Sequence, residues 1–163
     1  MLPDILSKNL KLVICGTAAG NKSALRQAYY AGPGNKFYRT LFQIGLTPSL
    51  INPYDYQELL NFGIGLTDLV KCKSGMDHTL KTEHFDVKGF RDKMERYKPS
   101  IICFNGKEPA RVFMGLSSTS KISYGLQNLL LGNTRLYVAT STSGAAKDSW
   151  DENTWMELKT LIG

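Results

Sequence analysis

The sequence feature that most constrains the fold is a short apolar run that ends at a glycine turn. Residues 12–15 read LVIC, and Gly16 and Gly20 then frame a turn of small residues. A continuous apolar run of this length is typical of a strand buried on both faces, as in a parallel sheet covered by helices. Because open α/β sheets bind ligands at the carboxyl ends of their strands, the turn predicts one wall of a pocket.

Two further apolar runs, at residues 100–105 and 135–140, predict strands of the same kind. Residues 62–69 predict a short strand or a tight bend, and residues 124–131 predict a strand or a hairpin arm. Residues 71–86 form the longest irregular stretch.

Helical patterns separate these strands. The last helix is expected to start at a capping box formed by Ser149 and Glu152. The other predicted helices cover residues 1–10, 35–44, 53–61, 87–97 and 108–116. Strands that alternate with helices predict a three-layer α/β/α sandwich around a mostly parallel sheet of four or five strands, in a single domain over residues 1–163.

The composition fits a folded intracellular protein. Apolar residues make up 42% of the chain and charged residues 21%, which is typical of a globular domain. No apolar run approaches the roughly 18 residues that a membrane-spanning helix needs. The N-terminus lacks the basic region and long apolar region of a secretory signal, so we expect a cytoplasmic location.

The cysteines argue against a metal site or a disulfide framework. They are three in number, widely spaced and without a CxxC motif, so they cannot form a four-cysteine zinc or iron–sulfur site. Cys15 and Cys103 fall in predicted buried strands, where a free cysteine packs as a small apolar side chain.

The net charge of +6 favours a polyanionic partner. Lysine and arginine side chains neutralise phosphates, and this neutralisation drives affinity for nucleic acids. A basic surface that is simply solvated is an equally good interpretation of the charge alone.

Three polar strand ends should meet at one edge of the predicted sheet. They are the turn at 16–20, Asp68 at the end of 66–68, and the hydroxyl-rich stretch 140–144. Each has a purely structural alternative. The 16–20 stretch could be only a tight turn, Asp68 could form a salt bridge at the rim or cap a helix, and the 140–144 stretch could be an ordinary turn with a serine or threonine cap. Asp68 could instead position water or stabilise a developing cation, and residues 141–147 could receive a phosphate.

Two tyrosines and an asparagine follow the first turn. Tyr29 and Tyr30 lie between two turns, where they are expected to be exposed and could stack on a flat ring, or could instead pack over the sheet edge. Asn35 either hydrogen-bonds a ligand or caps the helix that follows it, and the cap is the default interpretation.

Together these residues resemble a bacterial mismatch-specific uracil/thymine-DNA glycosylase of the uracil-DNA glycosylase superfamily. The resemblance runs through nearly the whole chain and rests on five motifs and Ser23. The motifs are CGTAAG (15–20), YYAGPGNKFY (29–38), GIGLTDLV (63–70), SGMD (74–77) and STSG (141–144).

The resemblance implies a monofunctional, monomeric hydrolase without a cofactor, acting in base excision repair near the bacterial nucleoid. Its substrate would be uracil, or another deaminated or mismatched base, flipped out of a duplex and cut from its sugar to leave an abasic site. Flipping costs a few kcal/mol and is cheapest at a mismatch, which gives selectivity.

The resemblance also assigns roles to residues. The stretch 141–147 would enter the minor groove and bind DNA through Ser141, Ser143, Gly144, Ala145 and Lys147. Tyr30 would stack on the flipped base. The remaining base-binding residues would be Gly16, Thr17, Ala18, Gly20 and Ser23.

The chain departs from the family at the position that matters most. Typical members carry an asparagine that activates water where this chain has Ala18. Asp68 is therefore the first candidate for the catalytic group, because a carboxylate stabilises the oxocarbenium-like sugar, and Asn35 is the second. Two alternatives follow: a module that binds mismatches or abasic sites without cutting, and a nucleotide-binding α/β enzyme unrelated to DNA.

Overall fold

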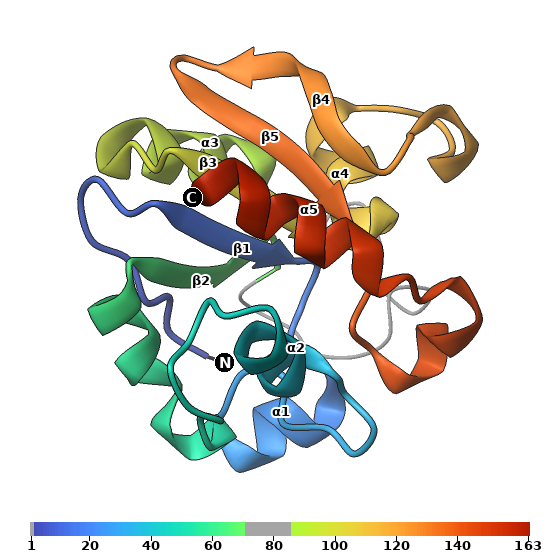
Figure 1. The fold of residues 1–163 in the computed structure, drawn as a ribbon. Coiled ribbons are helices and arrows are strands. Elements are labelled where there is room, and N and C mark those ends of the chain that lie inside the picture. Colours follow the sequence, from blue (N-terminus) through green and yellow to red (C-terminus); the bar gives the residue numbers. More distant parts are fainter. Residues whose placement is uncertain (1, 71–85) are drawn as a thin grey trace.

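A five-stranded sheet forms the centre of the protein, as seen in a computed structural model that describes residues 2–70 and 86–163 (Figure 1). The strand order is β2-β1-β3-β5-β4, and only β4 is antiparallel to its neighbour. The strands are β1 (Leu12–Gly16), β2 (Ile64–Asp68), β3 (Ile101–Asn105), β4 (Gly125–Leu131) and β5 (Thr134–Ala139). The predicted sandwich around a mostly parallel sheet is thereby confirmed.

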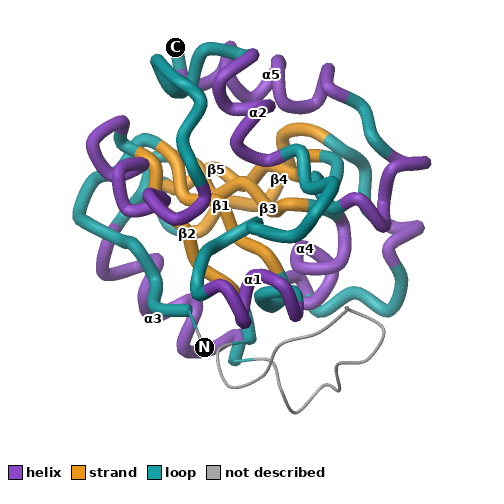
Figure 2. Tube along the Cα trace, turned by 90° about the horizontal axis from the view of Figure 1, so that it is seen from below, coloured by secondary structure: helices purple, strands orange, loops and turns teal. Residues whose placement is uncertain are grey.

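Helices cover both faces of the sheet (Figure 2). The helices α2 and α5 lie on one side, and α3 and α4 lie on the other. The α-helices are α1 (Asn21–Arg26), α2 (Phe37–Gln43), α3 (Val87–Tyr97), α4 (Lys107–Met114) and α5 (Glu152–Ile162). The 3₁₀ segments are η1 (Pro53–Phe62), η4 (Thr119–Lys121) and η5 (Gly144–Ser149).

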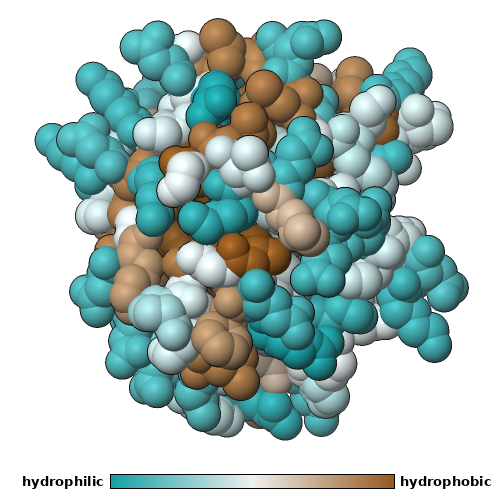
Figure 3. Space-filling view, in the orientation of Figure 1, coloured by the Kyte–Doolittle hydropathy of each residue, from teal (hydrophilic) through white to brown (hydrophobic). Residues whose placement is uncertain are grey.

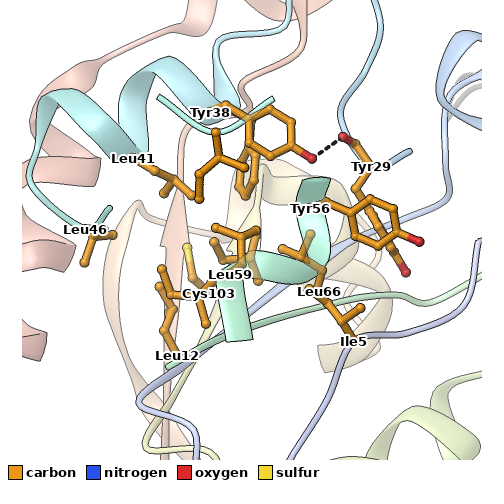
Figure 4. Close-up of a cluster of buried hydrophobic side chains, with 14 of the residues drawn as sticks. Ile5, Leu12, Tyr29, Tyr38, Leu41, Leu46, Tyr56, Leu59, Leu66 and Cys103 are labelled. Atoms are coloured by element: carbon orange, nitrogen blue, oxygen red, sulfur yellow. Dashed lines mark hydrogen bonds between the residues drawn. The ribbon is translucent and has the colours of Figure 1, made fainter. Parts of the chain in front are cut away.

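The alternation of side chains along each buried strand divides the core in two. Leu12 and Ile14 of β1 face a cluster with side chains of α2, η1 and α5. Val13 and Cys15 face a second cluster with α3 and α4. Figure 4 shows part of the first cluster. Both faces of β1 are therefore buried, as its continuous apolar sequence predicts.

The parallel register places four strand ends on one edge. Gly16 of β1 is the register partner of Asp68 of β2, and Asn105 of β3 is the partner of Ala139 of β5. The chain leaves all four strands at this edge, where a space between the connecting segments becomes available for a site.

The N-terminal segment is extended and not helical, contrary to the prediction for residues 1–10. Ile5 pairs with Leu66 in an antiparallel bridge with backbone hydrogen bonds of 2.9 and 3.0 Å. Asp4 accepts a hydrogen bond from Thr67 Oγ1 at 2.7 Å and forms a 2.6 Å ion pair with Lys93. These contacts outweigh the helical preference because they give the segment long-range partners.

Two details of the helices also differ from the prediction. The helix α1 was not expected, since its six residues NKSALR carry no apolar stripe. The predicted capping box of Ser149 is wrong: the N-cap of α5 is Asp151, whose carboxylate accepts from Asn153 N at 3.0 Å. Ser149 ends η5 instead.

The face of Figure 1 carries hydrophilic side chains with scattered apolar ones between them (Figure 3). Within residues 2–70 and 86–163, no helix is long and apolar enough to cross a membrane. Cys15 and Cys103 are free and buried as predicted, and burial raises the pKa of the Cys103 thiol. Cys72, the 74–77 motif and all but the last residue of the predicted irregular stretch lie outside the described residues.

Candidate functional site

A cleft of about 790 Å³ opens at the carboxyl edge of the parallel strands. Its walls are the turn at residues 16–20, the 29–35 segment, the ends of β2 and β3, and the 141–146 stretch. The three polar strand ends predicted to converge do so here. A fourth, the end of β3, joins them through Asn105.

Asp68 lies on the cleft wall directly beside Gly16. It is only 4% exposed, so its carboxylate is largely removed from water. A Cβ added to Gly16 would stand 2.8 Å from Asp68 Oδ1 and 3.4 Å from Tyr30 Oη. Gly16 is thus required for close approach, because any side chain there would collide with the carboxylate.

Tyr30 lines the same part of the cleft. Its backbone φ is 53°, an uncommon left-handed conformation for a residue other than glycine. Its ring packs on Phe37, with the two ring centroids 4.1 Å apart. Burial and the Asp68 carboxylate raise the pKa of the Tyr30 hydroxyl well above its ordinary value, and the Asn105 side chain lowers it only in part.

Tyr29 also borders the cleft, but its ring is buried, although the sequence suggested that both tyrosines are exposed. It is 2% exposed and belongs to the core, where its hydroxyl donates to the Pro3 carbonyl at 3.0 Å. Its own carbonyl accepts from Tyr38 Oη at 2.5 Å (Figure 4). Burial and the nearby Asp68 and Asp4 carboxylates raise the pKa of the Tyr29 hydroxyl.

Ser23 holds the loop that carries Tyr30. Its Oγ accepts from Ala31 N at 2.9 Å, while Arg26 donates to the Ala31 carbonyl at 2.7 Å. Both polar groups of the Ala31 backbone are therefore tied to α1. Ser23 borders the cleft, but the contact that the structure gives it fixes the loop.

Asn35 caps a helix, as its default interpretation predicts. Its Oδ1 accepts from Phe37 N, the first residue of α2, at 3.0 Å. The residue also borders the cleft. Its Nδ2 group makes no hydrogen bond within the described part of the chain, so the amide remains available to a ligand or a water.

Asn105 is the site residue that the sequence prediction missed. Its Nδ2 donates to Thr142 Oγ1 and its Oδ1 accepts from Thr142 N, each at 3.0 Å. This pair of bonds fixes the 141–144 stretch to the end of β3. The sequence does contain a signal for Asn105. It is a polar residue at the end of an apolar run, the same pattern that indicated Asp68.

Further contacts fix the same stretch to the opposite wall. Lys36 N donates to the Thr142 carbonyl at 2.9 Å. A Cβ on Gly144 would lie 3.3 Å from the Gly34 carbonyl oxygen, so the 32–34 turn and η5 pack closely. Beyond this contact Ala145 and Lys147 are exposed, while Ser143 caps η5 by accepting from Ala145 N at 3.2 Å.

Lys22 and Lys107 line the cleft, and Lys36 follows the cleft residue Asn35. Lys36 Nζ lies 5.5 Å from the centroid of the Trp150 ring, and Lys107 Nζ lies 4.5 Å from that of Tyr124. These aromatic contacts position the ammonium groups without neutralising them. Among the described residues, no cluster of histidine, cysteine or acidic side chains could hold a metal ion.

Ala18 lies at the cleft with its methyl group partly exposed. A methyl group can neither accept a proton nor orient water, so polar chemistry at this position depends on neighbouring groups. Asp68 is the acidic residue among the three polar strand ends at 16–20, 66–68 and 140–144. It borders the cleft together with the 16–20 turn that carries Ala18.

Comparison with known proteins shows a family and solved structures with a similar fold. The sequence model of the uracil DNA glycosylase superfamily matches residues 3–161. The fold is also similar to the solution NMR structure of a Methanosarcina acetivorans protein that carries the provisional name uracil DNA glycosylase. The TM-score is 0.65 at 23% sequence identity, and the match covers 99% of this chain and 96% of the other.

Proposed function

The chain belongs to the uracil DNA glycosylase superfamily, and from this membership and the cleft we propose that it excises uracil from mismatched duplex DNA. The reaction is hydrolysis of the N-glycosidic bond, which leaves an abasic site for base excision repair. The enzyme is monofunctional and acts as a monomer. The mismatch-specific branch and the bacterial origin suggested by the sequence motifs are part of this proposal.

The observation that carries the proposal is the position of Asp68. A buried carboxylate borders a cleft at the carboxyl edge of the sheet, beside the turn where the family's water-activating asparagine is replaced by Ala18. Departure of the base leaves a cation-like sugar. A carboxylate in a site that excludes water stabilises that charge far more strongly than it would in solution.

The bond changes assigned to this site are simple. The C1′–N bond breaks and its electron pair leaves with the base. A water oxygen then bonds to C1′, and the proton that it loses passes to the Asp68 carboxylate. Asn35 is the second candidate for holding the water, through the Nδ2 group that its cap does not use.

The base would lie between the 16–20 turn and Tyr30. Backbone groups of Gly16, Thr17, Ala18 and Gly20 are close enough to the cleft to bind the base edge, and the small side chains allow this approach. The Tyr30 ring, supported from behind by Phe37, supplies a flat surface for stacking. A mismatched pair lowers the cost of flipping, so G·U and G·T pairs are the favoured substrates.

The duplex would be held by the stretch from Ser141 to Lys147 and by lysines in and near the cleft. Ala145, which is exposed, would enter the minor groove, and its methyl group would fill little of the gap left by a flipped base. Lys107 of the cleft wall, together with Lys36 and the exposed Lys147, would contact phosphates. Such contacts make binding strongly dependent on salt.

A panel of duplexes, each with one lesion, tests the proposal. The wild-type protein is incubated with G·U, G·T, hypoxanthine, xanthine and etheno-adduct duplexes and with single-stranded controls, and abasic sites are detected by alkaline cleavage. We expect the fastest excision from G·U. The absence of abasic product from every duplex would contradict the proposal.

A binding module is the second candidate function. Ala18 and Ser141 favour it, because typical members of the family that the motifs resemble carry asparagine at both positions. This alternative predicts salt-dependent mismatch binding without any abasic product. The same panel, combined with a gel-shift measurement on each duplex, separates the two candidates.

A further inference from the structure

Tyr30 Oη is a buried hydroxyl without a hydrogen-bond partner among the described residues. The Asn105 side chain is near enough to affect its pKa, but no contact with normal hydrogen-bond geometry forms. An unsatisfied buried hydroxyl destabilises the folded state, because it has lost its hydrogen bonds to water and gained none in return. Its presence in a cleft therefore points to a polar atom that binds there during function.

Three other buried tyrosines make this exception informative. The hydroxyl groups of Tyr29, Tyr38 and Tyr137 donate to backbone carbonyls at 3.0, 2.5 and 2.5 Å. The fold thus satisfies these three buried hydroxyls. Tyr30 differs because its hydroxyl has no such acceptor among the described residues and because its backbone is left-handed.

The hydroxyl lies close to the candidate catalytic carboxylate. The position that a Gly16 Cβ would occupy is 3.4 Å from Tyr30 Oη and 2.8 Å from Asp68 Oδ1. Both oxygens therefore pack against Gly16, the last residue of β1, on the side where it lacks a side chain. We call Gly16 and these two oxygens the Gly16 niche.

We propose that Tyr30 is a positioning residue whose hydroxyl binds the attacking water in the Gly16 niche, together with Asp68. This inference rests on the proposed glycosylase function. The water donates one hydrogen to the carboxylate, and the hydroxyl occupies a second of its hydrogen-bonding positions. A lone pair of the water is then left to attack C1′.

A water fits the niche better than the edge of the base does. Uracil presents carbonyl oxygens on both sides of its ring N–H, and these oxygens are repelled by a carboxylate. Water can donate to the carboxylate and either donate to or accept from the hydroxyl. The chemistry of the two bordering oxygens thus selects the nucleophile.

The variant Tyr30→Phe tests the inference, because it keeps the ring that stacks on Phe37 and removes only the hydroxyl. Single-turnover excision of uracil from a G·U duplex should fall by about tenfold, which corresponds to the loss of one hydrogen bond, with duplex affinity unchanged. The melting temperature should stay the same or rise, since the deleted hydroxyl has no hydrogen-bond partner among residues 2–70 and 86–163.

Tyr29→Phe is the matched control. It removes a hydroxyl that donates to Pro3, so its melting temperature should fall while the rate of its folded fraction stays near wild type. In an Asp68→Asn background, Tyr30→Phe should lower the excision rate little further. Two residues that act on the same water have effects on the rate that are not additive.

Each outcome has a distinct meaning. A wild-type protein that excises nothing contradicts the proposed function itself. An active wild type with an equally active Tyr30→Phe variant overturns the role of the hydroxyl. A Tyr30→Phe variant whose preference among uracil, thymine and hypoxanthine changes, at an unaltered rate on uracil, also overturns it, because the hydroxyl then contacts the base.

Discussion

Gly16 and Asp68 are paired in the parallel register of β1 and β2, and the Asp68 carboxylate occupies space that a side chain on Gly16 would need. The carboxylate is therefore held at the cleft by the absence of a neighbouring methyl group. This steric relationship connects the first turn of the chain to the group that we assign to catalysis.

Gly16→Ala should displace that carboxylate. The added methyl would stand 2.8 Å from Asp68 Oδ1, closer than real Cβ contacts. We expect the single-turnover excision rate to fall about 10²-fold, the cost of a misplacement near 1 Å, and the free energy of unfolding to fall by about 1–3 kcal/mol.

Gly32→Ala is the steric control for this prediction. Its added Cβ would have Lys22 Cβ as its neighbour at 3.9 Å, which is an ordinary contact. Urea denaturation and rapid-quench assays should find a much smaller effect than for Gly16→Ala. If the two variants lost excision rate and stability equally, the effect of Gly16→Ala would not be specific to the contact between Gly16 and Asp68.

Asn105→Ala should release the 141–144 stretch from β3. The variant loses both hydrogen bonds to Thr142 and leaves the Thr142 N–H without its partner. Stability should fall by about 1–3 kcal/mol. Duplex affinity should weaken, because the proposed DNA-binding stretch must then be ordered on binding, whereas the excision rate at saturating enzyme should change little.

Thr142→Ser tests whether the hydrogen bonds matter more than the packing at that position. It keeps the hydroxyl that accepts from Asn105 and removes one methyl. Fluorescence anisotropy with a G·U duplex should give a dissociation constant near that of wild type. If Asn105→Ala binds the duplex as tightly as wild type, the stretch does not depend on this link.

Stability should decrease at alkaline pH. Burial raises the pKa of the Tyr29, Tyr30, Tyr38 and Tyr137 hydroxyls above the ordinary value of 10.0. Above that pH the unfolded chain loses these protons and the native protein keeps them, so the native state binds more protons and stability falls as the pH rises.

Urea denaturation at several pH values checks the sign and the window. The midpoint should be steady below about pH 9 and fall progressively above about pH 10, with the tyrosinate absorbance of these four tyrosines appearing only as the chain unfolds. Tyrosinate absorbance from all tyrosines in the folded protein would contradict the assigned burial.

The sequence was sufficient to predict the sheet and the meeting of its strand ends. Apolar runs such as LVIC can be buried only between two layers, and parallel strands must place Gly16 and Asp68 at the same edge. The antiparallel direction of β4 and the extended N-terminal segment depend on contacts far along the chain, such as Ile5 with Leu66.

The separate roles of residues that are close in sequence were less predictable. Tyr29 and Tyr30 are adjacent and both border the cleft, yet the Tyr29 hydroxyl donates to Pro3 whereas the Tyr30 hydroxyl has no partner among the described residues. Asn105 was missed because its partner Thr142 is 37 residues away in sequence. Ser149 and Asp151 compete to cap the same helix, and local spacing alone does not decide between them.

We propose that Asp68 supplies the catalysis that Ala18 cannot. This assignment is tested by single-turnover excision of uracil from a G·U duplex by wild type and Asp68→Asn. Asp92→Asn, which changes an exposed carboxylate on α3, serves as the control. We predict a loss of about 10²–10³-fold for Asp68→Asn with unchanged duplex affinity, and wild-type rates for the control. Excision by Asp68→Asn at the wild-type rate would contradict the claim.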